Sequence, residues 1–410
     1  MGLRPDSVSH PELLDTATPA VVLNSFGGFH FPGVARTLGR MGVEVWGLYG
    51  RPAPAETSRY YHQVRRWSVN SSSARALEEL LQLRAAIRSR PLLIPEDDVS
   101  LAFAEEHADE LREGFLFSDR PPGLASRLSS KQGMHDLCIE HGIPTPRTVF
   151  PRTSAEAAEA AETFQFPLVL KGIDGARLRA RIGTTMSIVA SRDELLQQYD
   201  ALEDVRDPNL MLQEYIPGAP SSVWMFEGYF DRSSDCLFGI TGQKLRQYPP
   251  YTGMTSLGVC VRNEVVSDQA KQLMRAVGYR GPLDCGFRYD ERDDTYKLLD
   301  VNPRVGASFR LFVSDNDVDI VTTMYLDLTG QALPAWEPVE GRKWVAENSD
   351  VISSLAYWRN GELGFGAWLR SLRGVDETAW FTRDDLRPAF TMLRRSLGSL
   401  VFDGRGRGRP

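Results

Sequence analysis

Residues 297–304, which read Lys-Leu-Leu-Asp-Val-Asn-Pro-Arg, constrain this chain more than any other stretch. The segment alternates like a β-strand, which would place Leu298, Asp300 and Asn302 on one sheet face. A proline then ends the strand, and Arg304 follows it. Carboxylate and amide oxygens beside a guanidinium suit a magnesium ion that is bound to a polyphosphate.

The preceding segment is predicted to pair with this strand. Residues 283–289 and 296–302 flank a polar turn centred on Arg292, so they should form a hairpin. In that register Asp284 lies opposite Asp300, and two facing carboxylates repel each other unless a cation lies between them. A shift of one residue would turn Asp284 to the other face. A solvated hairpin with surface acids is the alternative, which the Pro-Arg ending and the opposing acid disfavour.

Length and composition indicate a globular protein of several domains. A chain of 410 residues exceeds one ordinary core, so we expect two or three domains. The net charge of −7 disfavours general affinity for nucleic acid or membrane surfaces. The sequence holds four scattered cysteines, no signal-peptide pattern and no apolar run near the ~20 residues of a membrane helix. We therefore expect a cytoplasmic protein with reduced thiols.

The N-terminal region predicts a βαβ unit, with strands at 20–23 and 43–48 around a helix at 32–41. A dinucleotide-binding domain has to be considered for such a unit. The glycines after the first strand do not follow G-x-G-x-x-G, and no acid follows the second strand to hold a ribose. An NAD-dependent oxidoreductase is therefore disfavoured.

A further buried strand is predicted at 92–94, and it ends in acids at 96–98. Acids at the carboxyl end of such a strand could face a ligand crevice. Solvated acids that open the next helix are the favoured interpretation, because carboxylates stabilise a helix N-terminus.

The middle of the chain contains a candidate phosphate-binding loop. Residues 118–130, rich in proline and serine, form the first predicted domain boundary, and a helix is expected at 131–140. A strand at 167–170 then ends in Lys171, and the loop at 172–183 carries several glycines and arginines. Such a loop can hold phosphates, since lysine supplies a charge and glycine lets the backbone approach. A solvated hairpin loop is an equal alternative.

The second half predicts an antiparallel sheet. Strands are expected at 210–215 and 222–230, and a mobile basic loop at 245–256. A helix that Ser267 caps is expected to run to Val277. Beyond residue 336 the pattern weakens, and we interpret the tail as an accessory region that ends in a disordered Gly/Arg tip at 404–410.

In this order the elements resemble the ATP-grasp superfamily, and within it the carboxylate–amine ligases that are similar to D-aspartate ligases. The match covers about residues 20–335. Its most specific piece is Leu299-Asp300-Val301-Asn302-Pro303-Arg304, supported by Lys131, Lys171 and the run Gln213-Glu214-Tyr215-Ile216-Pro217-Gly218.

The resemblance implies a mixed α/β and α+β fold. A Rossmann-like pre-grasp α/β domain would occupy residues 1–125. The ATP-grasp domain would occupy residues 126–335, with a small lid subdomain at about 145–216 and a larger antiparallel-sheet part. Residues 336–410 would form the C-terminal accessory region.

The resemblance also implies which residues bind the nucleotide. Lys131 and Lys171 would contact the phosphates of ATP. Glu214 and the backbone near Tyr215 and Ile216 would read the adenine.

The metal and the reacting groups have their own implied residues. Asp300 and Asn302 would bind Mg²⁺, with Asp284 as the third ligand. The residues that would neutralise the transferred phosphoryl group and the acyl-phosphate are Lys244, Arg246 and Arg304. Arg310 could hold an acidic substrate or form a structural salt bridge.

Three positions depart from the family pattern. The loop at 172–183 has arginines where many relatives have glycines. Pro220 and Ser221 lie where many relatives have an acid for the ribose. Gly286 lies where related ligases often carry the first metal acid, so Asp284 would have to replace it.

The implied reaction joins a small-molecule carboxylic acid to an amine. Phosphorylation by ATP would turn the poorly electrophilic carboxylate into an acyl-phosphate, which the amine attacks with release of ADP and phosphate. The loop at 245–256 would close over this intermediate, because water would hydrolyse it. The partners would then be small molecules rather than nucleic acid or membranes, and the enzyme could form a homodimer.

A non-catalytic nucleotide-binding regulatory protein with the same fold is the alternative function. The presence of Asp300, Asn302 and Arg304 disfavours it.

Overall fold

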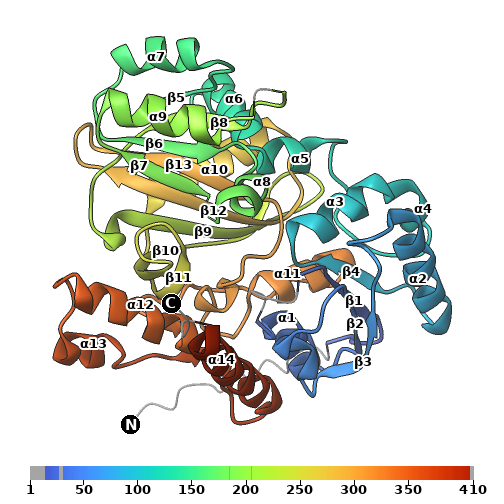
Figure 1. The fold of residues 1–410 in the computed structure, drawn as a ribbon. Helices are drawn as coiled ribbons and strands as arrows, with labels where there is room; N and C mark the ends of the chain where they lie inside the picture. Colours follow the sequence, from blue (N-terminus) through green and yellow to red (C-terminus); the bar gives the residue numbers. More distant parts are fainter. Residues whose placement is uncertain (1–13, 27–30, 184, 205, 407–410) are drawn as a thin grey trace, which may run out of the picture.

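The computed structural model describes residues 14–26, 31–183, 185–204 and 206–406, whose strands form three β-sheets (Figure 1). Part of the predicted loop after the first strand (27–30) and the end of the predicted tip (407–410) lie outside the described residues. Figure 1 shows the small lid sheet stacked over the large sheet, with the N-terminal domain beside them.

The N-terminal sheet is parallel and confirms the predicted βαβ unit. Its strands are β1 (Ala20–Asn24), β2 (Val45–Tyr49), β3 (Tyr61–Arg66) and β4 (Leu92–Pro95), in the order β3-β2-β1-β4. β1 is fully buried, as expected for a strand covered on both faces. The accompanying helices are α1 (Gly33–Met41), α2 (Ser73–Ala86), α3 (Asp98–Glu106) and α4 (Ala108–Arg112), with the short 3₁₀ helix η1 (Pro54–Thr57).

Two helices lead from this domain into the lid, namely α5 (Leu124–Ser129) and α6 (Lys131–His141). The Ser130 side chain caps α6 by accepting a hydrogen bond from the backbone N–H of Gly133. Gly142 ends the helix in the left-handed conformation, with φ 67°, which glycine adopts without strain. The expected helix at 131–140 is therefore confirmed.

The lid is a four-stranded antiparallel sheet. Its strands are β5 (Thr148–Val149), β6 (Leu168–Gly172), β7 (Met186–Val189) and β8 (Leu210–Glu214), in the order β5-β8-β6-β7. Its helices are α7 (Ser154–Glu162), α8 (Gly175–Ile182) and α9 (Arg192–Leu202). Thr153 caps α7 and Ser191 caps α9.

Helix α8 shows that the expected loop at 172–183 is wrong, because most of this segment is helical, while its contact with phosphates stays a prediction. The Asp174 side chain accepts a hydrogen bond from the backbone N–H of Arg177, and alanine, arginine and leucine then favour a helix. Arg177 is 2.6 Å from Asp207, and Arg181 donates to the carbonyl of Leu202. These two arginines are therefore bound within the lid.

The large sheet has seven strands in the order β13-β12-β9-β10-β11-β14-β15. They are β9 (Val223–Phe230), β10 (Cys236–Tyr248), β11 (Met254–Cys260), β12 (Gly281–Asp290), β13 (Thr295–Asn302), β14 (Lys343–Val345) and β15 (Glu377–Thr378). Helices α10 (Glu264–Ala276) and α11 (Ile320–Leu328) accompany it. Along β9, Phe226 and Phe230 pack with α10 in one core, while Met225 and Tyr229 pack with α1 and α11 in the other.

Two predictions in this half need correction. The expected loop at 245–256 is wrong in extent, because β10 and β11 fill most of it and only residues 249–253 connect them. The residues of β11 include threonine, leucine and valine, which suit a buried strand. Helix α10 is capped by Asn263 rather than by Ser267, which lies within the helix.

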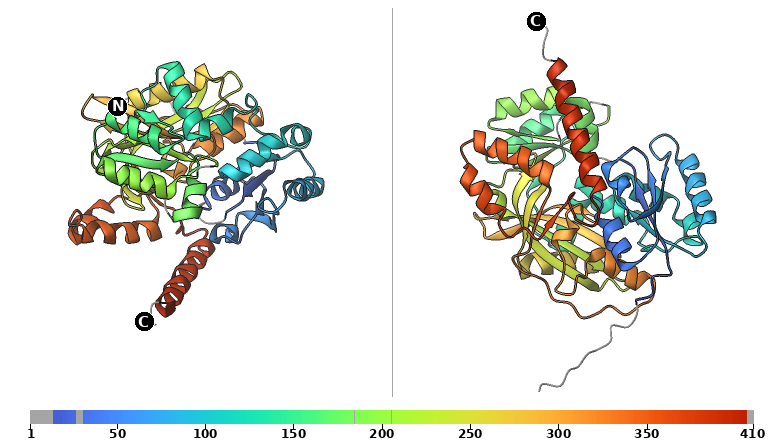
Figure 2. Two further views of the ribbon diagram at one scale, coloured as in Figure 1. Left: turned by 45° about the horizontal axis from the view of Figure 1, so that its top comes forward. Right: turned by 90° about the horizontal axis from the view of Figure 1, so that it is seen from below.

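As far as the structure describes it, the segment after residue 336 adds two strands to the large sheet and three helices. β14 pairs with β11, and β15 pairs with β14, so the segment after residue 336 extends the large sheet. It continues as α12 (Glu347–Arg359), α13 (Phe365–Ser371) and α14 (Arg387–Gly406), and α14 projects from the body (Figure 2). Residues 404–406 of the predicted disordered tip therefore belong to a helix, contrary to expectation. The domain limits at 125 and 335 stay predictions.

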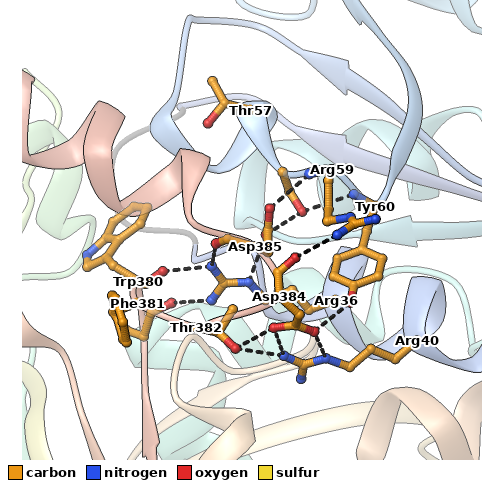
Figure 3. A network of polar contacts seen from close by, with 12 residues as sticks. Arg36, Arg40, Thr57, Arg59, Tyr60, Trp380, Phe381, Thr382, Asp384 and Asp385 are labelled. Atoms are coloured by element: carbon orange, nitrogen blue, oxygen red, sulfur yellow. Dashed lines mark hydrogen bonds and ion pairs between the residues drawn. The ribbon is translucent and has the colours of Figure 1, made fainter.

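A buried polar network ties the tail to α1 (Figure 3). The Arg36 guanidinium donates to the Asp385 carboxylate at 3.0 Å and to the backbone carbonyls of Ala379 and Trp380. The Asp385 carboxylate also accepts from Ser58 and from the backbone N–H of Arg59. The N-terminal domain and the tail are thus joined directly.

Two further observations concern the cysteines and the length of the helices. Cys138, Cys236, Cys260 and Cys285 are free thiols. Among the residues that the structure describes, no helix combines the length and apolar character that crossing a lipid bilayer requires.

Candidate functional site

The hairpin of β12 and β13 gathers the predicted metal ligands on one sheet face. Asp284 pairs with Asn302, and Gly286 pairs with Asp300, so the predicted pairing of Asp284 with Asp300 is wrong by two residues. A shift of two residues keeps the same face, because side chains alternate with period two. The Asn302 amide nitrogen donates to Asp284 and to Asp300, each at 3.1 Å.

A β-bulge at Leu299 accounts for part of this difference. Leu298 pairs with Phe287 and Asp300 pairs with Gly286, which leaves Leu299 as the extra residue. The extra residue interrupts the alternation, and Leu298 packs in the same core as Val301. The prediction that Leu298 shares the face of Asp300 is therefore wrong.

Three lysines converge on these acids from separate segments. Lys131, at the start of α6, donates to Asp300 at 3.0 Å. Burial, assisted by the nearby charge of Lys131, lowers the pKa of Lys171 on β6 to about 7, and Asp300 opposes the shift. Burial also lowers the pKa of Lys244 on β10, against the attraction of Asp300 and Asp284. Lys244 further donates to the carbonyl of Gly253 at 3.2 Å.

The acid at the centre of this group is kept ionised. Burial alone would raise the pKa of Asp300, but Lys131 and Lys171 outweigh it and hold that pKa well below its usual range. Burial raises the pKa of Asp284, an effect that Arg304 opposes. The predicted ligand Asp300 is thus poised as an anion among cations.

Arg304 links this cluster to the N-terminal domain. Its Nε donates to Asp98 at 2.9 Å, and only 15% of its side chain is exposed. Burial would lower the pKa of Arg304, but Asp98 and Asp284 outweigh it, and the pKa is raised. The site therefore lies where the large sheet meets the N-terminal sheet.

The acids after β4 are not all solvated, so the favoured interpretation of residues 96–98 is wrong in part. Glu96 is buried beside Asn24, which donates to it at 3.0 Å, and burial raises the pKa of Glu96 to about 8. Asp97 is also buried, although it does cap α3 as expected, and its carboxylate accepts from Ser25. Asp98 is the one that reaches Arg304, so this strand end faces the site as a crevice acid would.

The side chains on the hairpin fit a magnesium ion. A half-turn of the Asn302 amide would present its oxygen to the two carboxylates, which gives three oxygen donors around one point. No cluster of three or more His, Cys, Asp or Glu residues suited to a metal occurs within the described ranges. Two carboxylates and an amide nevertheless suit Mg²⁺, which is commonly held by one or two carboxylates together with substrate phosphates. A Cβ at Gly286 would lie 3.7 Å from the Asp300 carboxylate, so an acid at that position would reach the same group of side chains, and its replacement by Asp284 stays a prediction.

The sequence interpretation missed Glu227. This residue on β9 pairs with Asp284 and is fully buried. Its Oε1 accepts from the backbone N–H of Gly306 at 2.9 Å, and its Oε2 has no hydrogen-bond partner among the described residues. Burial and the neighbouring Asp284 raise its pKa well above the ordinary value. A glutamate inside the apolar run Val223–Phe230 was the available signal.

Arg246 does not join the cluster, contrary to expectation. A bulge at Leu245 separates it from the face of Lys244. Its guanidinium makes two hydrogen bonds to Asp350, at 2.7 and 2.8 Å, and a third to Ser371. Arg246 is therefore a buried link between β10 and the tail.

The predicted adenine-binding segment follows β8. Glu214 accepts from Lys297 at 3.0 Å, from Arg292 at 3.1 Å and from the backbone N–H of Arg147. Tyr215 and Ile216 come directly after this strand. Adenine contacts by these three residues stay a prediction.

Arg310 forms the structural salt bridge that was one of its two expected roles. It lies 2.7 Å from Asp319 and 2.9 Å from Glu377. Its side chain is buried, and Glu377 also pairs with Arg342.

The parallel sheet, the small lid and the large antiparallel sheet, with Lys131 of α6 and Lys171 of the lid beside Asp300 of the large sheet, give the chain an ATP-grasp fold. Comparison with protein-family models finds no match. Among curated proteins, the chain is similar to D-aspartate ligase from Enterococcus faecium, with 25% identity over 238 residues. The match covers 56% of each protein, so the chain spans about half the length of that relative.

Two solved structures show the same fold. L-amino acid ligase from Bacillus licheniformis superimposes with a TM-score of 0.57 at 16% identity, over 79% of this chain and 75% of that one. The biotin carboxylase domain of 2-oxoglutarate carboxylase from Hydrogenobacter thermophilus, in complex with MgADP, gives 0.61 at 17% identity, over 79% and 73%. At these identities the likeness establishes the fold.

Proposed function

We propose that this chain is an ATP- and Mg²⁺-dependent ligase that joins a small carboxylic acid to an amine through an acyl-phosphate, with release of ADP and phosphate. One observation carries the proposal. Side chains from four separate segments, three lysines and Arg304, surround Asp284, Asp300 and Asn302. The likeness to two proteins named as ligases supports it.

The charge balance of the cluster favours a polyphosphate ligand. Four basic side chains lie near the carboxylates of Asp284, Asp300 and Asp98, and burial lowers the pKa of two of them, Lys171 and Lys244, so a bound anion would favour their charged forms. Excess positive charge inside a protein is stabilised by a bound anion. A nucleotide triphosphate with its metal supplies that anion.

Each group then has a physical role in phosphoryl transfer. Asp284, Asp300 and Asn302 would hold Mg²⁺, which supplies positive charge against the phosphate oxygens when bound. Lys131 and Lys171 would hold the phosphate chain. The guanidinium of Arg304, and Lys244, would stabilise the negative charge that crowds together as the acid is phosphorylated. Asp98 orients Arg304 by accepting a hydrogen bond from the Nε of that arginine.

The acid and the amine would bind on the N-terminal side of Arg304. A cavity of about 220 Å³ lies there, lined by Pro95, Ser118, Arg120, Pro303 and Arg304 among others. Arg304 belongs both to this lining and to the cluster, whereas the three cluster lysines are not among the lining residues. Its position between two domains is typical of small-molecule sites.

The proposal is tested by a trapping experiment. The protein is incubated with ATP, Mg²⁺, hydroxylamine and a panel of carboxylic acids, and we expect hydroxamate to form from at least one acid together with ADP. Release of AMP and pyrophosphate would indicate an adenylating enzyme and contradict the acyl-phosphate. Nucleotide binding without acid-dependent ADP formation would support the regulatory alternative instead.

A further inference from the structure

Helix α12 packs with its polar side against the protein. The buried residues on this side are Asp350, Ser353, Ser354 and Tyr357. Asp350 binds Arg246, and the Ser353 hydroxyl donates to the carbonyl of Gln247. The inner contacts of this helix are thus largely hydrogen bonds and an ion pair.

The outward side of α12 is apolar. Val351, Ile352, Leu355 and Trp358 are 43–59% exposed, and 351, 355 and 358 follow one another at helical spacing. Helix α13, which lies beside α12 in Figures 1 and 2, adds Phe365 at 67% and Leu369 at 48%. We call these six residues the α12–α13 apolar face.

This arrangement is the reverse of an ordinary surface helix, which turns its apolar stripe toward the core. Contiguous exposed apolar surface on a folded protein marks a place where another surface packs. The face combines a tryptophan and a phenylalanine with aliphatic side chains, and aromatic anchors of this kind dominate the energy of protein–protein contacts.

The size and charges of the face fit a second copy of the same chain. Its six side chains expose on the order of 600 Å², taking ~150–250 Å² for a large side chain, so two such faces would bury ~1,200 Å², the lower end of the ~1,200–2,000 Å² in stable interfaces. Exposed neighbours of both signs, Arg359, Arg370 and Glu362, lie beside it, as a self-complementary contact requires. The acidic net charge of −7 makes an anionic lipid surface a poor match.

We propose that the α12–α13 apolar face is the contact between two copies of the chain related by a two-fold axis. The contact would also brace the candidate site. Tyr357 on the inner side of α12 accepts from the backbone N–H of Tyr251, and Gly253 in the same connection accepts from Lys244. Association would therefore hold the backbone beside a cluster lysine.

Sedimentation velocity of the full chain tests this proposal independently of any activity. We expect a species of twice the chain mass at micromolar concentration. The double variant Leu355→Glu/Trp358→Glu should sediment as a single chain with an unchanged circular dichroism spectrum. Ile139→Glu is the matched control, since Ile139 on α6 is 66% exposed outside the face, and it should leave the mass doubled.

Phe365→Glu provides a second variant whose side chain is the most exposed of the six, so its effect on folding is small. It should also yield a single chain. A wild-type protein that stays a single chain at ~100 µM, or a dimer that both glutamate variants retain, would overturn the proposal. Co-sedimentation of the wild type, but not of the variants, with phosphatidylglycerol vesicles would assign the face to lipid and overturn it as well.

Discussion

Among the individual side chains, Lys171 changes its charge near neutral pH. Burial and the adjacent Lys131 lower its pKa to about 7, so a large share of it is neutral above that pH in the free protein. A bound polyphosphate favours the charged form. Binding should therefore take up a proton at pH 8, and affinity should fall as pH rises above 7.

We expect MgADP to bind up to ~10-fold more weakly for each pH unit above 7, the limit for one linked proton. Calorimetry at pH 8 in two buffers of different ionisation enthalpy measures the proton uptake directly. Lys171→Arg is the control, because arginine stays charged and should show less uptake. Equal uptake in both proteins would contradict the assignment.

Asp300 gives the second prediction for a single side chain. Asp300→Ala should lower turnover ~10²–10³-fold or more, because it removes a proposed metal ligand and the partner of Lys131. The fold should persist, since the Asp300 side chain is 36% exposed. ADP release and thermal unfolding are the measurements. Glu291→Ala is the control, because Glu291 is an exposed acid in the turn of the same hairpin, and it should retain wild-type turnover. An Asp300→Ala variant whose turnover exceeds a tenth of the wild-type value would contradict the assignment.

Between β10 and the tail, Arg246 and Asp350 form a buried ion pair whose role is structural. Arg246→Ala leaves Asp350 buried without its partner, so we expect the free energy of unfolding to fall by ~3–5 kcal/mol. The double variant Arg246→Met/Asp350→Leu should recover much of that loss, because apolar residues of similar size replace buried pairs well. Urea denaturation measures both effects.

The double variant also separates structure from catalysis. If Arg246 only links β10 to the tail, its turnover stays within ~10-fold of wild type once stability is restored. A stable double variant whose turnover is ~10²-fold or more below wild type would indicate that Arg246 acts on the transferred phosphoryl group after all.

A helix or strand can be predicted from its local sequence only where the residue pattern is compatible with a single local structure. The hairpin at β12 and β13 was predictable, because its polar turn and flanking apolar residues exclude a helix. The bulge was not, since Leu298 and Leu299 are equally apolar and either can face the core. The same holds for Lys244 and Arg246, which only the bulge between them separates.

The lysines and acids of the candidate site were predictable as residues because their types and motif surroundings are distinctive. The partners of Glu214 and the burial of Glu227 were not, because they depend on Lys297 and Asp284 in other strands. Helix α8 was not predictable from its glycines and arginines, because these residues also suit a phosphate-binding loop, although the alanine and leucine between them favour a helix.

For the molecule as a whole, the contact of α1 with the tail gives a matched pair of arginines (Figure 3). Arg36 is 5% exposed in its pair with Asp385, whereas Arg40 is 32% exposed in its pair with Asp384. We expect Arg36→Ala to lower the free energy of unfolding by ~3–5 kcal/mol. Arg40→Ala should cost less than ~1 kcal/mol. Chemical denaturation compares the two, and equal losses would contradict this assignment of the contact.

The Arg36 network also bears on how the chain is made. The guanidinium of Arg36 lies in α1, yet its partners are residues 379–385, which are synthesised much later. During translation the Arg36 side chain would therefore have no partner for its charge until residues 379–385 had been made. A stalled or prematurely terminated product would keep this surface open, and the cell's quality-control proteases would have a ready means of telling it from the finished protein.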